Sequence, residues 1–126
     1  MPEFIEKRRY RRFEIPAGSV RYKRIIAPIL VQHFSKPRPV LNAGIGGLAF
    51  LSDEEFHQGE RLVIQLAAPN ENPLYLHSNL KWQGPIALSS DIIAGLEFME
   101  FGDNKDFNPP ETLGVLRRLY ARYVKG

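Results

Sequence analysis

Residues 40–51 read Val-Leu-Asn-Ala-Gly-Ile-Gly-Gly-Leu-Ala-Phe-Leu, two short apolar runs separated by a glycine-rich segment. Apolar runs of this length around a turn signal are typical of neighbouring β-strands. Three of the four residues from Gly44 to Gly47 are glycine, and glycine inside a strand is costly unless the backbone needs a positive φ or a close approach. The segment therefore predicts a β-bulge or tight turn. A second interpretation is a binding turn, in which the Asn42 amide contacts a base edge and backbone amides hold an anion.

Outward from this turn, the chain consists mainly of short runs of β-branched and aromatic residues broken by Pro and Gly. These runs predict further strands over residues 20–26, 61–66, 74–82 and 92–99. The Gly84-Pro85 pair is expected to end the strand that starts at residue 74. Several strands of about five to seven residues at short spacing are typical of an antiparallel barrel or a strongly curled sheet. We expect one mainly β domain over residues 13–126, preceded by a flexible basic arm at residues 1–12.

The C-terminal region has a different pattern. Pro109 and Pro110 precede a helical periodicity over about residues 111–124, with an apolar face. That face consists of Leu113, Leu116, Leu119, Tyr120 and Tyr123. Arg117, Arg118 and Arg122 lie mostly off it, and the simplest interpretation is that they face solvent. We expect an amphipathic helix that packs across an open end or an edge of the barrel.

The composition excludes several kinds of site. A chain of 126 residues without cysteine has no disulfides, thiolate zinc sites or cysteine nucleophiles. The three histidines, His33, His57 and His77, lack the spacing of a metal site. No serine lies in a Gly-x-Ser-x-Gly elbow. We therefore expect a non-enzymatic protein without a metal or cofactor.

The sequence also predicts a protein that does not enter a membrane. Its N-terminus carries charges where a signal peptide needs an apolar stretch. No run approaches the roughly 20 apolar residues that a spanning helix needs. The longest apolar stretch, residues 25–31, is interrupted by Pro28 and is interpreted as a buried strand. We expect a soluble, cytoplasmic protein.

Positive charge is concentrated near the N-terminus. The net charge is only +3, but five of the six residues 7–12 are Lys or Arg, with Tyr10 as the exception. Guanidinium groups bind phosphate oxygens in pairs and stack on purines. Because this cluster is confined to a few residues, it favours a small anionic partner. A protein that binds duplex DNA would have basic residues over a whole face. Two other interpretations of the cluster are a basic tail that is simply exposed to solvent and a patch that binds nucleic acid.

The arm and the turn become specific when they are combined. Arg8 and Arg12 form an Arg-x-x-x-Arg arm, and Asn42 and Gly47 are the outer positions of an Asn-x-Gly-x-x-Gly turn about thirty residues later. This combination resembles the PilZ domain, the bacterial receptor module for the second messenger cyclic di-GMP. That family has Arg-x-x-x-Arg followed by Asp/Asn-x-Ser-x-x-Gly. Four further stretches resemble the family's strands in the same order: residues 47–50, 59–66, 80–82 and 95–98.

The resemblance implies a six-stranded antiparallel β-barrel of the split-barrel type with a C-terminal α-helix. It also implies that Arg8 and Arg12 clamp a phosphate and the O6/N7 edge of a guanine, while Asn42 binds a second base edge. Gly44 and Gly47 would let cyclic di-GMP lie close to the backbone. The arm would order on binding and change the surface shown to a protein partner in signal transduction. Two neighbouring arm residues are possible auxiliary contacts: Arg9 and Arg11.

One position departs from the family pattern, because Gly44 replaces the serine. A lost hydrogen bond to a charged group costs about 1.5–3 kcal/mol. This departure leaves open a PilZ-like interaction module that has lost ligand binding. A third alternative is an oligonucleotide-binding barrel that uses the basic arm and the aromatic residues. Trp82 is interpreted as core or barrel-rim packing rather than as a ligand contact.

Overall fold

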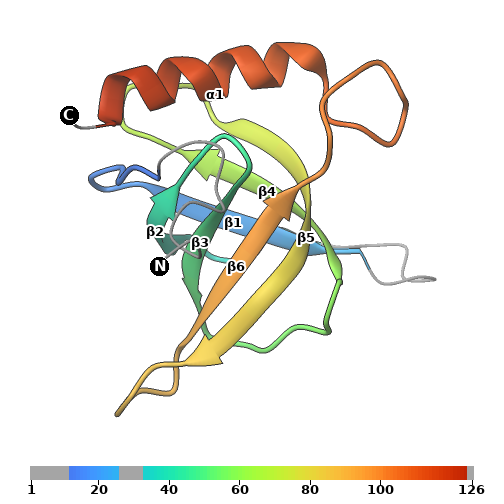
Figure 1. Cartoon of the computed structure of the whole chain (residues 1–126). Helices are drawn as coiled ribbons and strands as arrows, with labels where there is room; N and C mark the ends of the chain where they lie inside the picture. Colours follow the sequence, from blue (N-terminus) through green and yellow to red (C-terminus); the bar gives the residue numbers. More distant parts are fainter. Residues whose placement is uncertain (1–11, 26–32, 125–126) are drawn as a thin grey trace, which may run out of the picture.

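Six antiparallel strands form a closed barrel in the computed structural model, which describes residues 12–25 and 33–124 (Figure 1). The strands are β1 Ser19–Arg24, β2 Arg38–Ala43, β3 Gly47–Ser52, β4 Arg61–Ala67, β5 Leu74–Pro85 and β6 Ile92–Phe98. Their order around the barrel is β1-β2-β3-β6-β5-β4, and antiparallel pairing between β1 and β4 closes it. The predicted fold class, a six-stranded antiparallel barrel with a C-terminal helix, is confirmed.

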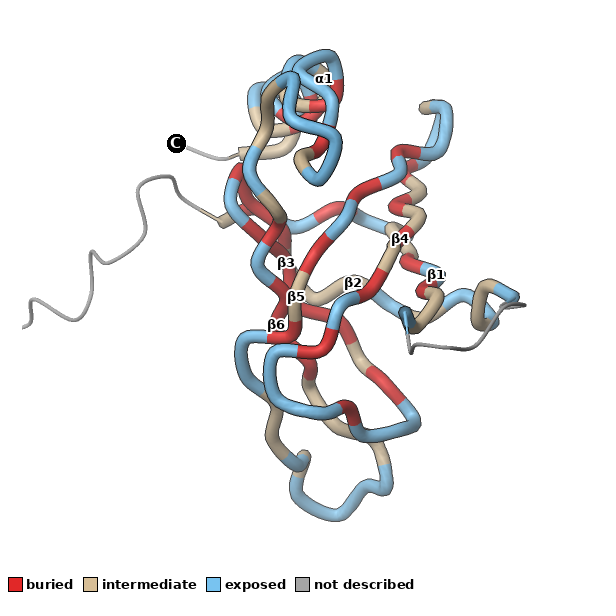
Figure 2. The backbone as a smooth tube through the Cα atoms, turned by 90° about the vertical axis from the view of Figure 1, so that its right-hand side faces the viewer, coloured by how far each residue is buried: buried red, intermediate tan, exposed pale blue. Residues whose placement is uncertain are grey.

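In β1, β4 and the first part of β5, every second residue is buried in the barrel interior. In β4 the buried Leu62, Ile64 and Leu66 alternate with more exposed neighbours, as the period of two in a β-strand requires. In the middle of β3, Phe50 is fully buried. Buried positions along the strands and exposed positions in the hairpin loops away from the helix are visible in Figure 2. The alternation read from the sequence therefore corresponds to the inner and outer faces of the barrel.

A single helix in the described part of the chain, α1 Pro110–Tyr123, crosses one end of the barrel (Figure 1). Pro110 occupies its first turn, where no intrahelical amide bond is lost. Leu116 and Leu119 are buried against the barrel. The predicted helix and its position over the end of the barrel are confirmed. No helix in residues 12–25 and 33–124 is long and apolar enough to cross a membrane.

Besides its buried leucines, hydrogen bonds and aromatic contacts hold α1 on the rest of the molecule. Glu71, in the turn between β4 and β5, accepts hydrogen bonds from Arg118 at 3.2 Å and from Arg122 at 2.8 Å. At the C-terminal end of the helix, the ring of Phe13 packs edge-on against Tyr120 and stacks parallel to Tyr123, with centroids 5.8 and 6.3 Å apart. The segment that enters the barrel from the N-terminal arm therefore contacts the C-terminal helix directly.

A buried asparagine fixes the chain where it enters the helix. The Asn108 side chain is fully buried and accepts a hydrogen bond from the backbone amide of His77 at 2.7 Å. Its amide donates to the carbonyls of His77 and Met99 at 3.1 and 3.0 Å. Because His77 is in β5 and Met99 follows β6, this one side chain joins the ends of both strands to the start of α1.

Strand β5 ends at Pro85, where the Gly84-Pro85 pair is expected to end it, and its pairing with β6 shifts between Leu80 and Trp82. One detail differs from the prediction. Ile25, the first residue of the apolar stretch interpreted as a buried strand, is 46% exposed just after β1. The next residues of that stretch, 26–31, lie outside the described part of the chain.

Candidate ligand-binding site

The glycine-rich segment forms the hairpin turn between β2 and β3. The amide of Gly44 donates to the carbonyl of Gly47 at 2.8 Å, which closes the turn. The carbonyl of Gly46 accepts a hydrogen bond from the amide of Phe98 in β6, also at 2.8 Å. The turn is therefore fixed on the neighbouring strand, and the Gly44 amide is already used within it.

Close approach, and not a positive φ, explains the glycine at the end of this turn. A Cβ atom at Gly47 would lie 2.1 Å from the carbonyl oxygen of Leu96 in β6. At Gly46, by contrast, a Cβ atom would have nothing within 4 Å. Gly59 is the one glycine with a positive φ in the described ranges, and it lies far from the turn in sequence. The turn thus needs glycine at position 47 in order to pair tightly with β6.

The structure brings Arg12 and Asn42 into contact. The Nη1 atom of Arg12 donates a hydrogen bond to Oδ1 of Asn42 at 2.8 Å. A shift in the β2–β3 pairing between Val40 and Asn42 lies next to this contact, and such bulges re-aim side chains. Phe13 and Ala43 exchange two backbone hydrogen bonds of 2.7 and 2.8 Å. These bonds hold Arg12 beside the turn.

The other predicted arm residues, Arg8, Arg9 and Arg11, lie outside the described part of the chain. Of the predicted site, the structure therefore brings together Arg12, Asn42 and the glycine turn, which are separated by about thirty residues in the sequence.

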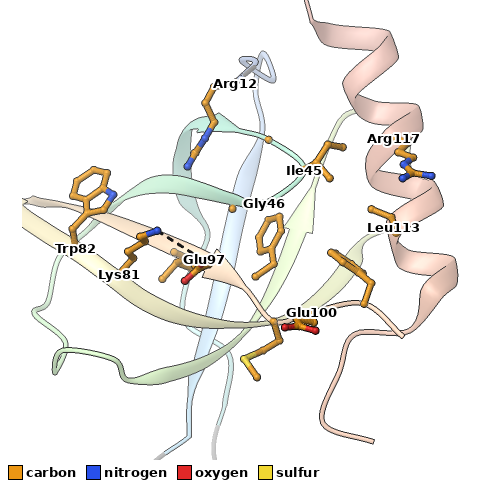
Figure 3. A pocket seen from close by; sticks show the side chains of 15 residues that line it. Arg12, Ile45, Gly46, Lys81, Trp82, Glu97, Glu100, Leu113 and Arg117 are labelled. Atoms are coloured by element: carbon orange, nitrogen blue, oxygen red, sulfur yellow. Dashed lines mark ion pairs between the residues drawn. The ribbon is translucent and has the colours of Figure 1, made fainter. Parts of the chain in front are cut away.

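A groove of about 440 Å³ runs from this turn to α1. One wall holds Arg12, the turn residues 44–47 and the β5 residues Lys81 and Trp82; the other holds Leu113 and Arg117 of α1 (Figure 3). Residues 96–101 of β6 and the segment after it line the groove as well. Its volume is in the range of sites for small-molecule ligands.

Trp82 lies at the barrel surface and not in the core. Its side chain is 45% exposed and lines the groove, so of the two predicted kinds of packing, core packing is wrong. The ring packs on Gly95 of β6, where a Cβ atom would lie only 2.1–2.6 Å from three indole atoms. A glycine inside a predicted strand, which often marks a close approach, is the sequence signal for this arrangement.

The charges in the groove are mixed. Arg12, Lys81 and Arg117 contribute three cationic groups, while Glu97 and Glu100 contribute two carboxylates. Lys81 and Glu97 form an ion pair at 3.8 Å, with both side chains more than half exposed. Such a pair is weak in water. The groove therefore combines guanidinium groups, an open aromatic ring and hydrogen-bond acceptors, which suits an anionic ligand that also carries aromatic rings with donor edges.

A second charged cluster has a structural explanation. Arg24 donates to both carboxylate oxygens of Glu60, at 2.5 and 2.7 Å, and to Glu54 at 2.9 Å. Burial acts to raise the pKa of Glu60, but the hydrogen bonds and the charge of Arg24, together with the backbone amide of His57, outweigh it and lower the pKa. Burial and a hydrogen bond to Glu54 raise the pKa of Tyr22. Tyr22, Arg24, Glu54 and Glu60 are thus joined in one hydrogen-bonded cluster.

Neither a metal site nor a known relative adds to this description. In the described ranges, no three His, Asp or Glu side chains gather as metal ligands would. No protein-family model matches the sequence, and a search of curated proteins finds no match.

Proposed function

We propose that this protein is a non-enzymatic receptor domain for cyclic di-GMP, of the PilZ type. The observation that carries the proposal is the hydrogen bond between Arg12 and Asn42 beside the glycine turn. Two residues on which the resemblance depends are thirty positions apart in sequence, yet Arg12 lines a groove of ligand size and Asn42 is hydrogen-bonded to Arg12. If the basic segment were only a solvent-exposed tail, there would be no reason for Arg12 to contact Asn42.

The groups in the groove match the chemistry of the ligand. Cyclic di-GMP has two phosphates and two guanines. Arg12, with Arg8, would bind a phosphate and the O6/N7 edge of one guanine, the acceptor pair that arginine also reads in DNA. Asn42 would bind a second base edge. The open face of Trp82 offers a stacking surface for a purine, which is worth about 1–3 kcal/mol in other complexes.

The replacement of serine by Gly44 lowers the expected affinity. The Gly44 amide donates within the turn, so it cannot replace the missing hydroxyl without breaking that bond. One lost charged hydrogen bond weakens binding by about ten- to a hundredfold. We therefore expect binding in the micromolar range. Tighter binding would require a water molecule in place of the hydroxyl.

We expect the arm to become ordered when the ligand binds. This ordering would change the surface that the protein presents to a partner, and so transmit the signal. Phe13 follows Arg12 directly and packs on Tyr120 and Tyr123 of α1. A ligand that engages Arg12 would therefore act next to a contact that joins the arm to the C-terminal helix. The expected site of action is the bacterial cytoplasm.

Isothermal titration calorimetry of the purified chain with cyclic di-GMP tests the proposal, with GTP and a single-stranded oligonucleotide as comparisons. We expect saturable binding of cyclic di-GMP alone. No heat with cyclic di-GMP at high micromolar concentration overturns the proposal and favours an interaction module without a ligand. Tighter, steeply salt-dependent binding of the oligonucleotide favours the nucleic-acid barrel instead.

Two variants sharpen this test. Arg12→Ala should abolish measurable binding, whereas Arg21→Ala, an exposed arginine of β1 outside the groove, should leave it unchanged. Gly44→Ser restores the family hydroxyl at a position without a positive φ and should bind equally well or more tightly. Equal losses in Arg12→Ala and Arg21→Ala would indicate an effect of net charge and contradict the assigned site.

A further inference from the structure

The C-terminal helix forms a wall of the groove, although the sequence assigns its basic face to solvent. Leu113 and Arg117 both line the groove, and they are four residues apart, so they lie on one face of α1. Figure 3 shows this helix across the groove from Trp82 and Lys81. A molecule that fills the groove therefore contacts the barrel and the helix together.

The three arginines of α1 have different partners. Arg118 and Arg122 both donate to Glu71, whose side chain is only 16% exposed, and so they hold the helix on the barrel. Arg117 is exposed, and within residues 12–25 and 33–124 it forms no ion pair or hydrogen bond through its side chain. Its guanidinium group is thus available at the groove without breaking a contact that the fold needs.

The charges elsewhere in the groove limit where an anionic group can bind. Glu97 and Glu100 line the groove and would repel a phosphate placed beside them. Lys81 is already paired with Glu97. The favourable positions for phosphate are therefore near Arg12 on the barrel side and near Arg117 on the helix side. Apolar side chains, including Ile45 and Phe101, also line the groove and suit the flat rings of a base.

We infer that Arg117 binds the second anionic group of the ligand, so that a ligand with two phosphates bridges the barrel and α1. This inference rests on the proposed function, since it assumes a cyclic dinucleotide in the groove. It adds a specificity residue outside the arm and the glycine turn. It also implies that a ligand with a single phosphate loses one of the two arginine contacts.

Calorimetry with cyclic di-GMP on Arg117→Gln and Arg118→Gln tests the inference. Arg118 is the matched control, because it is the next residue on the same helix, has the same charge and pairs with Glu71 instead of lining the groove. We expect Arg117→Gln to weaken binding at least about tenfold, the effect of one charged hydrogen bond. Arg118→Gln should stay within about twofold, and Arg117→Lys should recover part of the loss.

The outcomes separate this inference from the proposed function. If the unmodified chain binds cyclic di-GMP and Arg117→Gln binds equally well, the inference is wrong and the proposed function stands. Equal losses in Arg117→Gln and Arg118→Gln also contradict it, because they indicate a general effect of helix charge. Absence of binding by the unmodified chain overturns both proposals. Thermal unfolding of each variant shows whether it is folded.

Discussion

Gly46 and Gly47 are adjacent in the same turn, yet the structure requires glycine at only one of them. A side chain at Gly47 meets the backbone of Leu96, which cannot move without separating β3 from β6. A side chain at Gly46 projects into open space next to the groove. Gly47 is therefore needed by the fold, whereas Gly46 leaves room for a ligand.

We expect Gly47→Ala to lower the free energy of unfolding by about 3 kcal/mol, the upper part of the range for overpacking. Gly46→Ala should change it by less than about 1 kcal/mol, because the methyl group meets nothing and φ is not positive. Urea denaturation of both variants measures the two values. Similar values for the two variants would contradict the division of roles.

The sequence identified the turn, but it did not show that Gly47 and Gly46 have different roles. The glycine cluster and Asn42 predicted a tight turn or a binding turn. The structure confirms the tight turn, and a groove lies beside it. Which glycine meets a neighbouring backbone depends on the register between β3 and β6. Those strands are separated by about forty residues, and local sequence does not encode a register over that distance.

Among the secondary-structure elements, the bulge in β5 gives the groove its aromatic surface. Alternation along β5 places Leu80 inside the barrel, and the register shift that follows leaves both Lys81 and Trp82 exposed. Gly95 on the paired strand then receives the indole ring. The ring is held on one side by the sheet and open to the groove on the other.

Gly95→Ala should displace this ring. We expect the affinity for cyclic di-GMP to fall about tenfold, within the range for loss of one stacked base, and the stability to fall by only about 1 kcal/mol because a half-exposed ring can move outward. Gly84→Ala in the paired strand β5 is the control, since a Cβ atom there meets nothing within 4 Å. Unchanged affinity in Gly95→Ala, measured by calorimetry, would show that the ring position is irrelevant to binding.

The strands and the helix were predictable because their periods appear in the sequence. Residues 61–66 and 92–99 alternate or run as buried strands, and β4 Arg61–Ala67 and β6 Ile92–Phe98 agree closely with them. The bulge that exposes Trp82 was not predictable. It depends on the pairing of β5 with β6, so the tryptophan looked like ordinary packing.

For the whole molecule, the ion pair of Arg24 with Glu60 links β1 to the start of β4. Glu60 is buried, and its pKa is lowered in the folded state relative to an ordinary value of 4.5. A lowered folded-state pKa stabilises the fold at pH values above the ordinary pKa. This stabilisation is lost as the pH falls through the lower, folded-state value.

We expect Glu60→Gln to cost about 2–3 kcal/mol of unfolding free energy at neutral pH, where it removes a charged, buried partner. The difference from the unmodified chain should shrink as the pH falls below about 4.5. Urea denaturation across this pH range measures it. The exposed Glu55, changed to Gln, should show little difference at any pH, and a constant penalty in Glu60→Gln would argue for lost packing rather than lost charge.

The position of Trp82 has an optical consequence. It is the only tryptophan among the 126 residues, and it lies half exposed in the groove. All indole emission from the protein therefore originates at the proposed binding surface, and a purine stacked on that ring should quench it. The unlabelled chain thus contains its own reporter, with which occupancy of the groove can be followed in real time and at protein concentrations too low for calorimetry.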